Sequence, residues 1–215
     1  MTAAPRLNHA ERIYRFYLDR IRSGALGRED RLVDTVIAAD MGISRMPVRE
    51  ALLRLAAEGY LEPSSRGFTL PALTPAQIAE VFELRHLLEP RAVALCARSL
   101  PEPAMDRLAE AIALAESTFP TADVPRFFQA SESFRNGWIA EIPNGALRAA
   151  IQRYVAQVQL VRLATIGDES ARRAIVKNQR ALLAAFRARD ALAAHDIMRD
   201  FIVEGELSWR ARAQP

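Results

Sequence analysis

Apolar residues recur every three or four positions in two stretches near the start of the chain. They are Ile13, Phe16, Tyr17 and Ile21 in residues 9–23, and Val48, Ala51, Leu52 and Leu55 in residues 45–58. Because this spacing places the side chains on one face of an α-helix, each stretch is predicted to be an amphipathic helix with a buried side. A shorter helix is predicted over residues 32–41, ending in a turn at Gly42.

Residues at both ends of the 45–58 stretch indicate where that helix begins and ends. Ser44 carries a small hydroxyl suited to capping a helix, and Pro47 falls in the first turn, where its missing N–H costs nothing. Beyond Gly59, residues 60–62 and 68–70 are predicted to form two short strands, joined by the basic turn 63–67. Two short helices joined through a glycine and followed by a basic hairpin predict a winged helix-turn-helix.

The rest of the chain shows helical patterns only. Prolines at 71 and 75 make a stiff junction, since each fixes its own φ and restrains the preceding residue. Beyond it, helices are predicted over about 75–98, 103–117, 123–141, 145–166, 168–188 and 190–212. The predicted fold is therefore mainly α, with a winged helix-turn-helix domain over 1–72 and an all-α helical bundle over 73–215.

Composition narrows the class of protein. The chain has 215 residues, half of them apolar, which is enough for one small and one medium domain. Its single cysteine, Cys96, excludes an intramolecular disulfide and is typical of a reducing cytoplasm. We see no apolar run long enough for a signal peptide or a membrane span. The net charge of +3 is too small to indicate nucleic-acid binding by itself.

Two arginines at the start of the 45–58 helix are candidates for reading DNA. Arg45 and Arg49 lie one turn apart, at the end of the helix that a helix-turn-helix protein inserts into the major groove. There an arginine can donate two hydrogen bonds to guanine O6 and N7. Such a pair also occurs on ordinary solvated helix faces. The glycine turn before it and the hairpin after it favour DNA recognition.

The segment from residue 32 to residue 70 resembles the DNA-binding domain of the GntR family of bacterial transcription regulators. The run GISRMPVREALLRLAAEG, residues 42–59, matches the family pattern almost residue by residue. The resemblance implies that Arg45 and Arg49 contact bases, and that Ser44, Arg66 and Gly67 contact phosphate or the minor groove. Met46 stands where the family often has threonine. A thioether cannot donate to phosphate, so a backbone contact is lost or the base preference is altered.

The helical part resembles the FCD effector domain of the FadR-type subfamily. The residues that carry this resemblance are Phe82-Glu83-Leu84-Arg85, Leu88-Glu89, Phe134 with Asn144, Ala188-Arg189-Asp190 and Met198-Arg199. It implies a homodimer that binds an inverted-repeat operator in double-stranded DNA and responds to a small-molecule effector. Repression relieved by a metabolite is the common outcome in this subfamily. Activation also occurs, and the sequence does not choose between them.

The chain departs from its family at the metal site. Most FCD domains hold a divalent metal with one aspartate and three histidines. The corresponding positions here are Ser131, Arg135, Gln179 and Phe201, and none is a usual ligand for a transition metal. The histidines, His9, His86 and His195, lie elsewhere in the sequence. We therefore expect a domain without metal or other cofactor.

Arg135 would place a permanent positive charge where the family has its metal. It could clamp the carboxylate or phosphate of an effector, with Ser131 and Gln179 adding hydrogen bonds and Phe201 an apolar wall. Arg85 is a possible second cation.

In the alternative interpretation, Arg135 pairs with Glu132 or another acid, and Phe201 fills the vacant space. The domain would then be only a dimerisation scaffold. We find no nucleophile–base pair, glycine-rich phosphate loop or metal cluster in the sequence, so we expect no enzyme. We interpret Cys96, Trp138 and Trp209 as packing residues, although Trp138 could line the cavity mouth.

Overall fold

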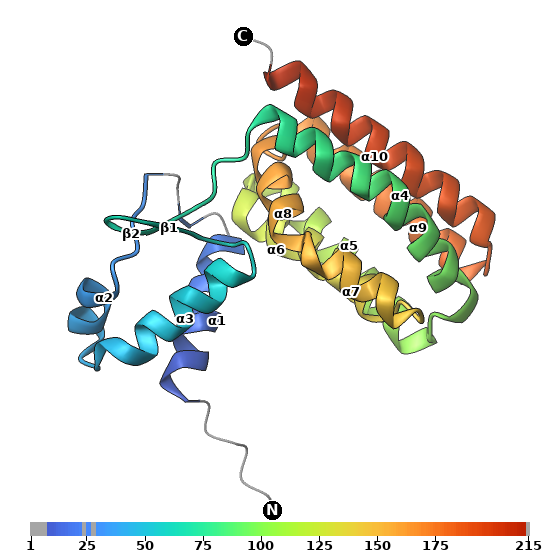
Figure 1. Cartoon of the computed structure of the whole chain (residues 1–215). Helices are drawn as coiled ribbons and strands as arrows, with labels where there is room; N and C mark the ends of the chain where they lie inside the picture. Colours follow the sequence, from blue (N-terminus) through green and yellow to red (C-terminus); the bar gives the residue numbers. More distant parts are fainter. Residues whose placement is uncertain (1–7, 23–24, 27–28, 214–215) are drawn as a thin grey trace, which may run out of the picture. The chain divides into compact units, whose positions relative to one another are not determined.

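The computed structural model describes residues 8–22, 25–26 and 29–213. The chain divides after Ala72 into two compact units. The first contains α1 (His9–Arg22), α2 (Asp34–Met41), α3 (Arg45–Ala57) and a hairpin of β1 (Glu62–Ser64) and β2 (Gly67–Thr69) (Figure 1). The second contains helices only, so the predicted fold class is confirmed. Residue 23, the predicted end of the first helix, lies outside the described residues.

The core of the N-terminal unit forms where α3 packs against α1 and α2. The predicted buried face of α3 is confirmed, since Val48, Ala51, Leu52 and Leu55 are all buried. Gly42 has a left-handed backbone conformation, with a φ of 63°, and ends α2 as expected. Packing of this face therefore fixes which side of α3 remains in solvent.

The hairpin is real, but its strands are displaced from the predicted residues. Strand pairing joins Glu62 to Thr69 and Ser64 to Gly67, and leaves residues 65–66 as the turn. The prediction of a strand over 60–62 was wrong at its start because the N–H of Tyr60 donates to the carbonyl of Leu55, 2.9 Å away, at the end of α3. Tyr60 and Leu61 are buried in the core rather than paired in the sheet.

Gly67 ties this hairpin, the wing, to the segment before α2. Its φ is 119°, and a Cβ atom at this position would lie 2.6 Å from the carbonyl oxygen of Leu32. Leu32 and the neighbouring Phe68 exchange two backbone hydrogen bonds of 2.8 and 2.9 Å. The glycine is therefore required both by its backbone conformation and by close contact with a neighbouring strand.

The C-terminal unit is a bundle in which α4 and α10 lie side by side along most of their length (Figure 1), while α5 packs on α6 and α9. Its elements are α4 (Pro75–Ser99), α5 (Glu102–Ser117), the 3-10 turn η1 (Phe119–Thr121), α6 (Val124–Ala140), α7 (Gly145–Arg153), α8 (Val155–Thr165), α9 (Glu169–Arg187) and α10 (Ala191–Ala213). Side chains of Thr74, Asp123, Asn144 and Asp168 cap helices at the breaks. These caps satisfy backbone N–H groups that have no partner within the helix.

One predicted helix is two. The stretch 145–166 was expected to be continuous, but it breaks at Tyr154, which separates α7 from α8. No proline or glycine marks the break in the sequence. Helices α7 and α8 pack against each other. In addition, α7 packs on α4 and α6, whereas α8 packs on α4 and α10. Tertiary packing therefore decides this break, since each half follows a different set of neighbours.

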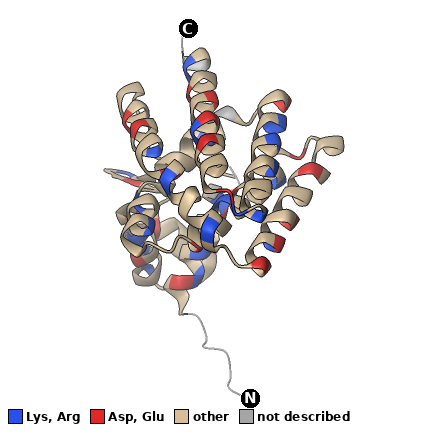
Figure 2. Cartoon of the chain, turned by 90° about the vertical axis from the view of Figure 1, so that its right-hand side faces the viewer, with Lys and Arg blue, Asp and Glu red and all other residues tan. Residues whose placement is uncertain are grey.

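Basic and acidic residues are interspersed along the helices of both units (Figure 2). This agrees with the small net charge of +3. None of the described helices is apolar over a length that would cross a bilayer.

We predict that Gly67→Ala weakens the wing. The added Cβ meets the Leu32 carbonyl in a backbone conformation that L-residues rarely adopt, which costs about 1–3 kcal/mol. Native-state hydrogen exchange at the amides of Leu32 and Phe68 should detect the loss. Gly42→Asn is the matched control, because nothing lies within 4 Å of a Cβ there and asparagine tolerates φ > 0. Equal protection of both amides in Gly67→Ala and the native chain would contradict the prediction.

Candidate functional site

The N-terminal end of α3 presents cationic and apolar side chains to solvent. The side chains of Arg45 and Arg49 are 55% and 49% exposed, and Met46 is 72% exposed. All three point away from the buried face of the helix. The structure therefore brings the predicted base-reading residues together on an open surface.

Asp34 on α2 positions both arginines. Its Oδ2 lies 3.0 Å from Nε of Arg45 and 3.4 Å from Nη1 of Arg49. Burial by itself would raise the pKa of the Asp34 carboxyl, but the two guanidinium groups outweigh it and hold the pKa below its usual value. The carboxylate thus stays charged and restrains two long side chains at the start of α3.

Of the remaining predicted DNA-contacting residues, Ser44 and Arg66 are exposed, whereas Gly67 begins β2 and is partly buried. Ser44 occupies the N-cap position of α3, but its side chain makes no capping hydrogen bond, so that part of the prediction was wrong. Its exposed hydroxyl remains available to a ligand. Arg66 is exposed at the wing tip, where its N–H donates to the hydroxyl of Ser64. The close approach of its backbone to Leu32 requires a glycine at position 67 for structural reasons, independently of any contact with DNA.

Arg54, nearer the end of α3, makes contacts that hold the N-terminal unit together. It bonds Glu11 of α1 at 2.8 Å and Glu58 at 3.1 Å, and its guanidinium lies 3.8 Å from the ring centroid of Tyr14. Tyr14 in turn donates to Glu58. These contacts join α1 to α3. The arginines of α3 therefore divide into an exposed pair at its start and a structural one near its end.

In the C-terminal unit, all of the residues predicted to bind an effector line one cavity of about 20 Å³. The predicted residues are Arg85, Ser131, Arg135, Gln179 and Phe201; the other lining residues are Phe134, Trp138, Arg162, Asn178, Leu182, Ile197 and Met198. The alignment with the family's metal positions thus selected side chains that meet in space. This volume holds about one water molecule.

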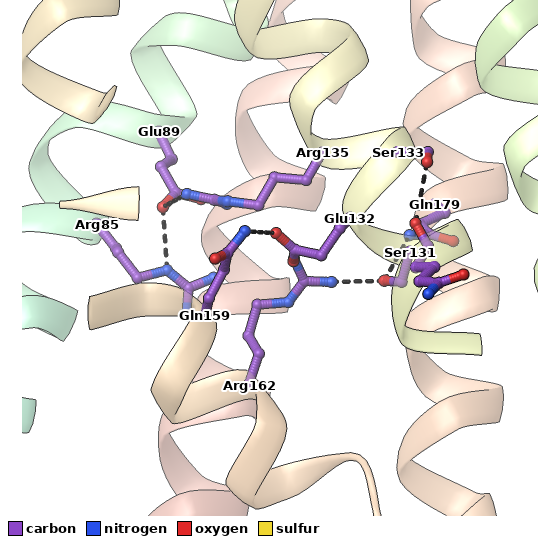
Figure 3. Close-up of polar contacts among 10 residues, drawn as sticks. Arg85, Glu89, Ser131, Glu132, Ser133, Arg135, Gln159, Arg162 and Gln179 are labelled. Atoms are coloured by element: carbon purple, nitrogen blue, oxygen red, sulfur yellow. Dashed lines mark hydrogen bonds and ion pairs between the residues drawn. The ribbon is translucent and has the colours of Figure 1, made fainter. Parts of the chain in front are cut away.

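Arg135 pairs with a buried acid, as the alternative interpretation expected; that acid is Glu89 and not Glu132. Nη1 and Nη2 of Arg135 each lie 2.9 Å from a carboxylate oxygen of Glu89 (Figure 3). Oε1 of Glu89 also accepts a 3.0 Å hydrogen bond from Nε of Arg85. All three side chains are buried, so this is a bidentate ion pair extended by a second cation.

Glu132 belongs to a second part of the same cluster. Arg162 and Gln159 of α8 donate to its two oxygens (Figure 3). The hydroxyl of Ser131 accepts from Arg162 and from Nε2 of Gln179, the latter at 3.1 Å. The sequence prediction missed Arg162. Its signal was an arginine in the uncharged, mostly apolar stretch around it, residues 155–163, where a buried charge is costly unless it is paired.

The three buried guanidinium groups differ in how well they are compensated. Burial disfavours the charge of each. Glu89 overcomes this at Arg135 and raises its pKa, whereas burial prevails at Arg85 and Arg162 and lowers theirs. For Glu89, burial would raise the pKa, but Arg135 and Arg85 lower it to about 2. The best-matched partners are therefore Arg135 and Glu89.

Comparison with known proteins places both units. Residues 9–69 match the model of bacterial regulatory proteins of the gntR family, and residues 80–204 match the FCD domain. The chain is a GntR-family transcription regulator with an FCD domain. Its relatives are transcriptional regulators, not enzymes.

Individual relatives cover less of the chain. The transcriptional regulator McbR of Escherichia coli is 32% identical over 113 residues, which span 52% of this chain and 51% of McbR. The gluconate operon transcriptional repressor of Bacillus subtilis is 41% identical over 70 residues, 33% of this chain and 29% of the repressor. The aligned part of the chain thus spans about half of McbR and less than a third of the repressor.

Solved structures share the whole fold. E. coli McbR/YncC has a TM-score of 0.78 at 23% identity, over 96% of this chain and 99% of that one. A putative GntR regulator from Rhodococcus sp. RHA1 has the same TM-score at 20% identity, over 95% and 99%.

The residues at the family's metal positions in this regulator do not suit a metal ion. They supply a hydroxyl, a guanidinium, an amide and a phenyl ring, and the guanidinium would repel a cation. Within the described residues, no three His, Cys, Asp or Glu side chains are grouped as a metal site requires. Cys96 is buried, which raises the pKa of its thiol to about 12, in keeping with its expected packing role.

We predict that Glu89→Gln destabilises the C-terminal unit by about 3–5 kcal/mol, because it leaves the Arg135 guanidinium buried without a counter-charge. Both tryptophans, Trp138 and Trp209, lie in this unit, so denaturant unfolding followed by their fluorescence measures the change. Glu206→Gln is the control. It breaks a partly exposed pair with His86 and should cost less than about 1 kcal/mol.

The same pair predicts the response to acid. Because the pKa of Glu89 falls from 4.5 to about 2 on folding, its stabilising contribution is complete above the higher value and is lost as pH falls through the lower one. The stability difference between the native chain and Glu89→Gln should therefore narrow between these two pH values. Denaturant unfolding at stepped pH tests this, and an unchanged difference would show that Glu89 carries no such shift.

Proposed function

We propose that this regulator binds an inverted-repeat operator in double-stranded DNA as a homodimer, with Arg45 and Arg49 reading bases in the major groove. The carrying observation is the exposure of both arginines at the N-terminal end of a helix whose opposite face is fully buried. A helix anchored in this way can enter the groove as a rigid element. Dimer symmetry then matches operator symmetry.

Backbone contacts complete this proposal. Ser44 and Arg66 would contact phosphates or the minor groove from the start of α3 and from the wing tip. Gly67 would let the wing approach the DNA closely. Met46, at 72% exposure, would contact an apolar base edge such as the thymine methyl, since it cannot donate to phosphate.

We further propose that a small organic acid controls DNA binding from the cavity of the FCD domain. The residues would be Arg85, Ser131, Arg135, Gln179 and Phe201, as the sequence predicted. Support comes from their meeting around one cavity that also holds buried cationic groups. Because Arg135 is already bound to Glu89, it would form part of the wall and set the charge of the site.

Helix α4 connects this cavity to the DNA-binding unit along the chain. It carries Arg85 and Glu89, and it begins at Pro75, directly after the proline-containing junction. Arg85 therefore lies about three helical turns from that junction. An acid that prefers one arrangement of the winged helices would shift DNA affinity by its difference in affinity for the two. We propose repression as the sign of regulation, since one relative is named a repressor.

The second candidate is a regulator whose FCD domain only holds the dimer together. The small cavity, about 20 Å³, and the bidentate pairing of Arg135 with Glu89 favour it. In that case no organic acid should change DNA affinity.

We expect Arg49→Ala to weaken operator binding by about 1–3 kcal/mol, roughly 5- to 150-fold, through loss of a bidentate base contact. The operator is first selected from a random double-stranded DNA library with the full chain, and binding is then measured by fluorescence anisotropy at fixed salt. Arg15→Ala on α1 removes the same charge from the same unit and serves as control. Equal losses in both variants, or an unchanged ratio of operator to random DNA affinity, would refute base reading by Arg49.

A further inference from the structure

The exposed apolar side chains of the C-terminal unit gather on two neighbouring helices. Among the described residues of this unit, the large apolar side chains left exposed are Leu87, Leu114, Leu192, Val203 and Leu207. All but Leu114 lie on α4 or α10, which run side by side (Figure 1). A contact of 3.0 Å between His86 and Glu206 joins these helices, so Leu87 and Leu207, the next residues in each, lie at the same level. Exposed apolar area of this kind is typical of a surface that a partner covers.

Charged residues extend the exposed position of α4 in both directions. Glu80 and Glu83 precede Leu87, and Arg91 and Arg98 follow it, all of them exposed. Their helical spacing places them in one row along the helix, which we call the α4 stripe. The opposite side of α4 is buried in the bundle. Within the part of the chain that the structure describes, none of the four charged side chains has a hydrogen bond or an ion pair. These charges are therefore available to a partner.

The charges of the α4 stripe are ordered by sign. Both acids lie on the N-terminal side of Leu87, and both arginines lie on its C-terminal side. Such a helix complements a copy of itself that runs in the opposite direction, because a two-fold axis exchanges its two halves. With the axis at Leu87, Glu83 lies opposite Arg91 of the partner subunit, since each is four residues, about 6 Å, from the axis. Parallel helices in register would instead bring like charges together, which is costly.

The face formed by α4 and α10 is large enough for a stable dimer. The helices have 25 and 23 residues, so each is about 35 Å long at a rise of about 1.5 Å per residue. Two helices of about 10 Å diameter lying side by side present on the order of 700 Å². A standard protein interface buries roughly 800 Å² per partner. Apolar side chains with charges around them are also the usual composition of such a surface.

We propose that two copies of this regulator pair through the outer face of α4 and α10, with the two α4 helices antiparallel across a two-fold axis at Leu87. The inference rests on the proposed homodimer and names the surface that forms it. Glu83 and Arg91 exchange ion pairs across the axis, where Leu87 meets its copy. Because the same helix carries Arg85 and Glu89 on its buried side, the dimer contact and the cavity share one rigid element.

The first test disrupts the centre of the surface. Fluorescence-detected sedimentation velocity of the labelled full chain, over a dilution series, measures the dissociation constant of the dimer. Leu87→Glu brings two carboxylates together at the axis and should weaken the dimer roughly tenfold or more. Leu114→Glu adds the same charge at an exposed leucine of α5 and should leave the constant unchanged, and circular dichroism checks that both variants keep their helices. An unchanged dissociation constant in Leu87→Glu would overturn the proposed surface.

Charge reversal tests the antiparallel order. Glu83→Arg alone leaves cations facing each other across the axis, and Arg91→Glu alone leaves anions, so each should dimerise roughly tenfold less tightly. An equal mixture of the two variants should form a heterodimer about as tight as the native dimer, because every facing pair again has opposite charges. The double variant should recover in the same way. Glu110→Arg, an exposed position on α5, changes the net charge equally and should have no effect.

This recovery separates a contact between chains from one within a chain. Glu83 and Arg91 are eight residues apart, more than two helical turns, so they do not pair along α4. If the mixture and the double variant both dimerise as weakly as the single variants, the antiparallel order is wrong.

Operator binding, measured by anisotropy in parallel, distinguishes failure of this inference from failure of the proposed function. A native chain that stays monomeric even on the operator refutes the proposed homodimer and this inference with it. A native dimer that resists every α4 variant refutes only this inference, because the homodimer then forms through another surface. We expect Leu87→Glu to bind the operator more weakly than the native chain, since two separate chains must then occupy the two half-sites.

Discussion

The carboxylate of Glu89 can be buried in the C-terminal bundle only because two guanidinium groups reach it. An isolated carboxylate would lose several kcal/mol of hydration on leaving water. Here Arg135 meets it with two parallel hydrogen bonds of 2.9 Å, and Arg85 adds a third from the same helix. These contacts join α4 to α6, and the Glu132 contacts of Arg162 join α6 to α8. Two groups of buried ion pairs thus join three helices of the bundle.

At the positions where the family resemblance implies metal ligands, this chain has Ser131, Arg135, Gln179 and Phe201. A metal ion would bring positive charge to one point, and here guanidinium groups line the cavity that these residues form. Arginine carries its charge at every physiological pH and directs its donors in a plane. Arg135 joins α6 to α4 through its ion pair with Glu89.

The DNA-binding unit uses the same chemistry in a different setting. Asp34 holds Arg45 and Arg49, as Glu89 holds Arg135 and Arg85. In the bundle both cations are buried, so their pairing contributes to structure. On α3 both are about half exposed, and the ion pairs are screened by water. DNA phosphates and bases can therefore compete for these arginines, whereas nothing in solvent competes for Arg135.

The sequence by itself determined the fold class and the exposed face of α3, because these depend on local patterns. The spacing of Val48, Leu52 and Leu55 set the buried face of α3, and that face left Arg45 and Arg49 in solvent. Helix bounds followed caps and prolines wherever these existed. The break at Tyr154 had no such signal, and only the packing of α7 and α8 on different neighbours produced it.

For the cavity, too, the sequence determined one part and the tertiary structure another. Alignment of the family pattern was enough to select side chains that meet around one cavity, since bundle positions are fixed by helix registers. The partner of Arg135 was decided only in three dimensions. Glu132 lies on the same helix as Arg135, whereas Glu89 comes from α4, 46 residues earlier in the sequence. Arg162 came from beyond the unpredicted break. Long-range pairing of charges depends on how helices are turned against one another, which no local pattern specifies.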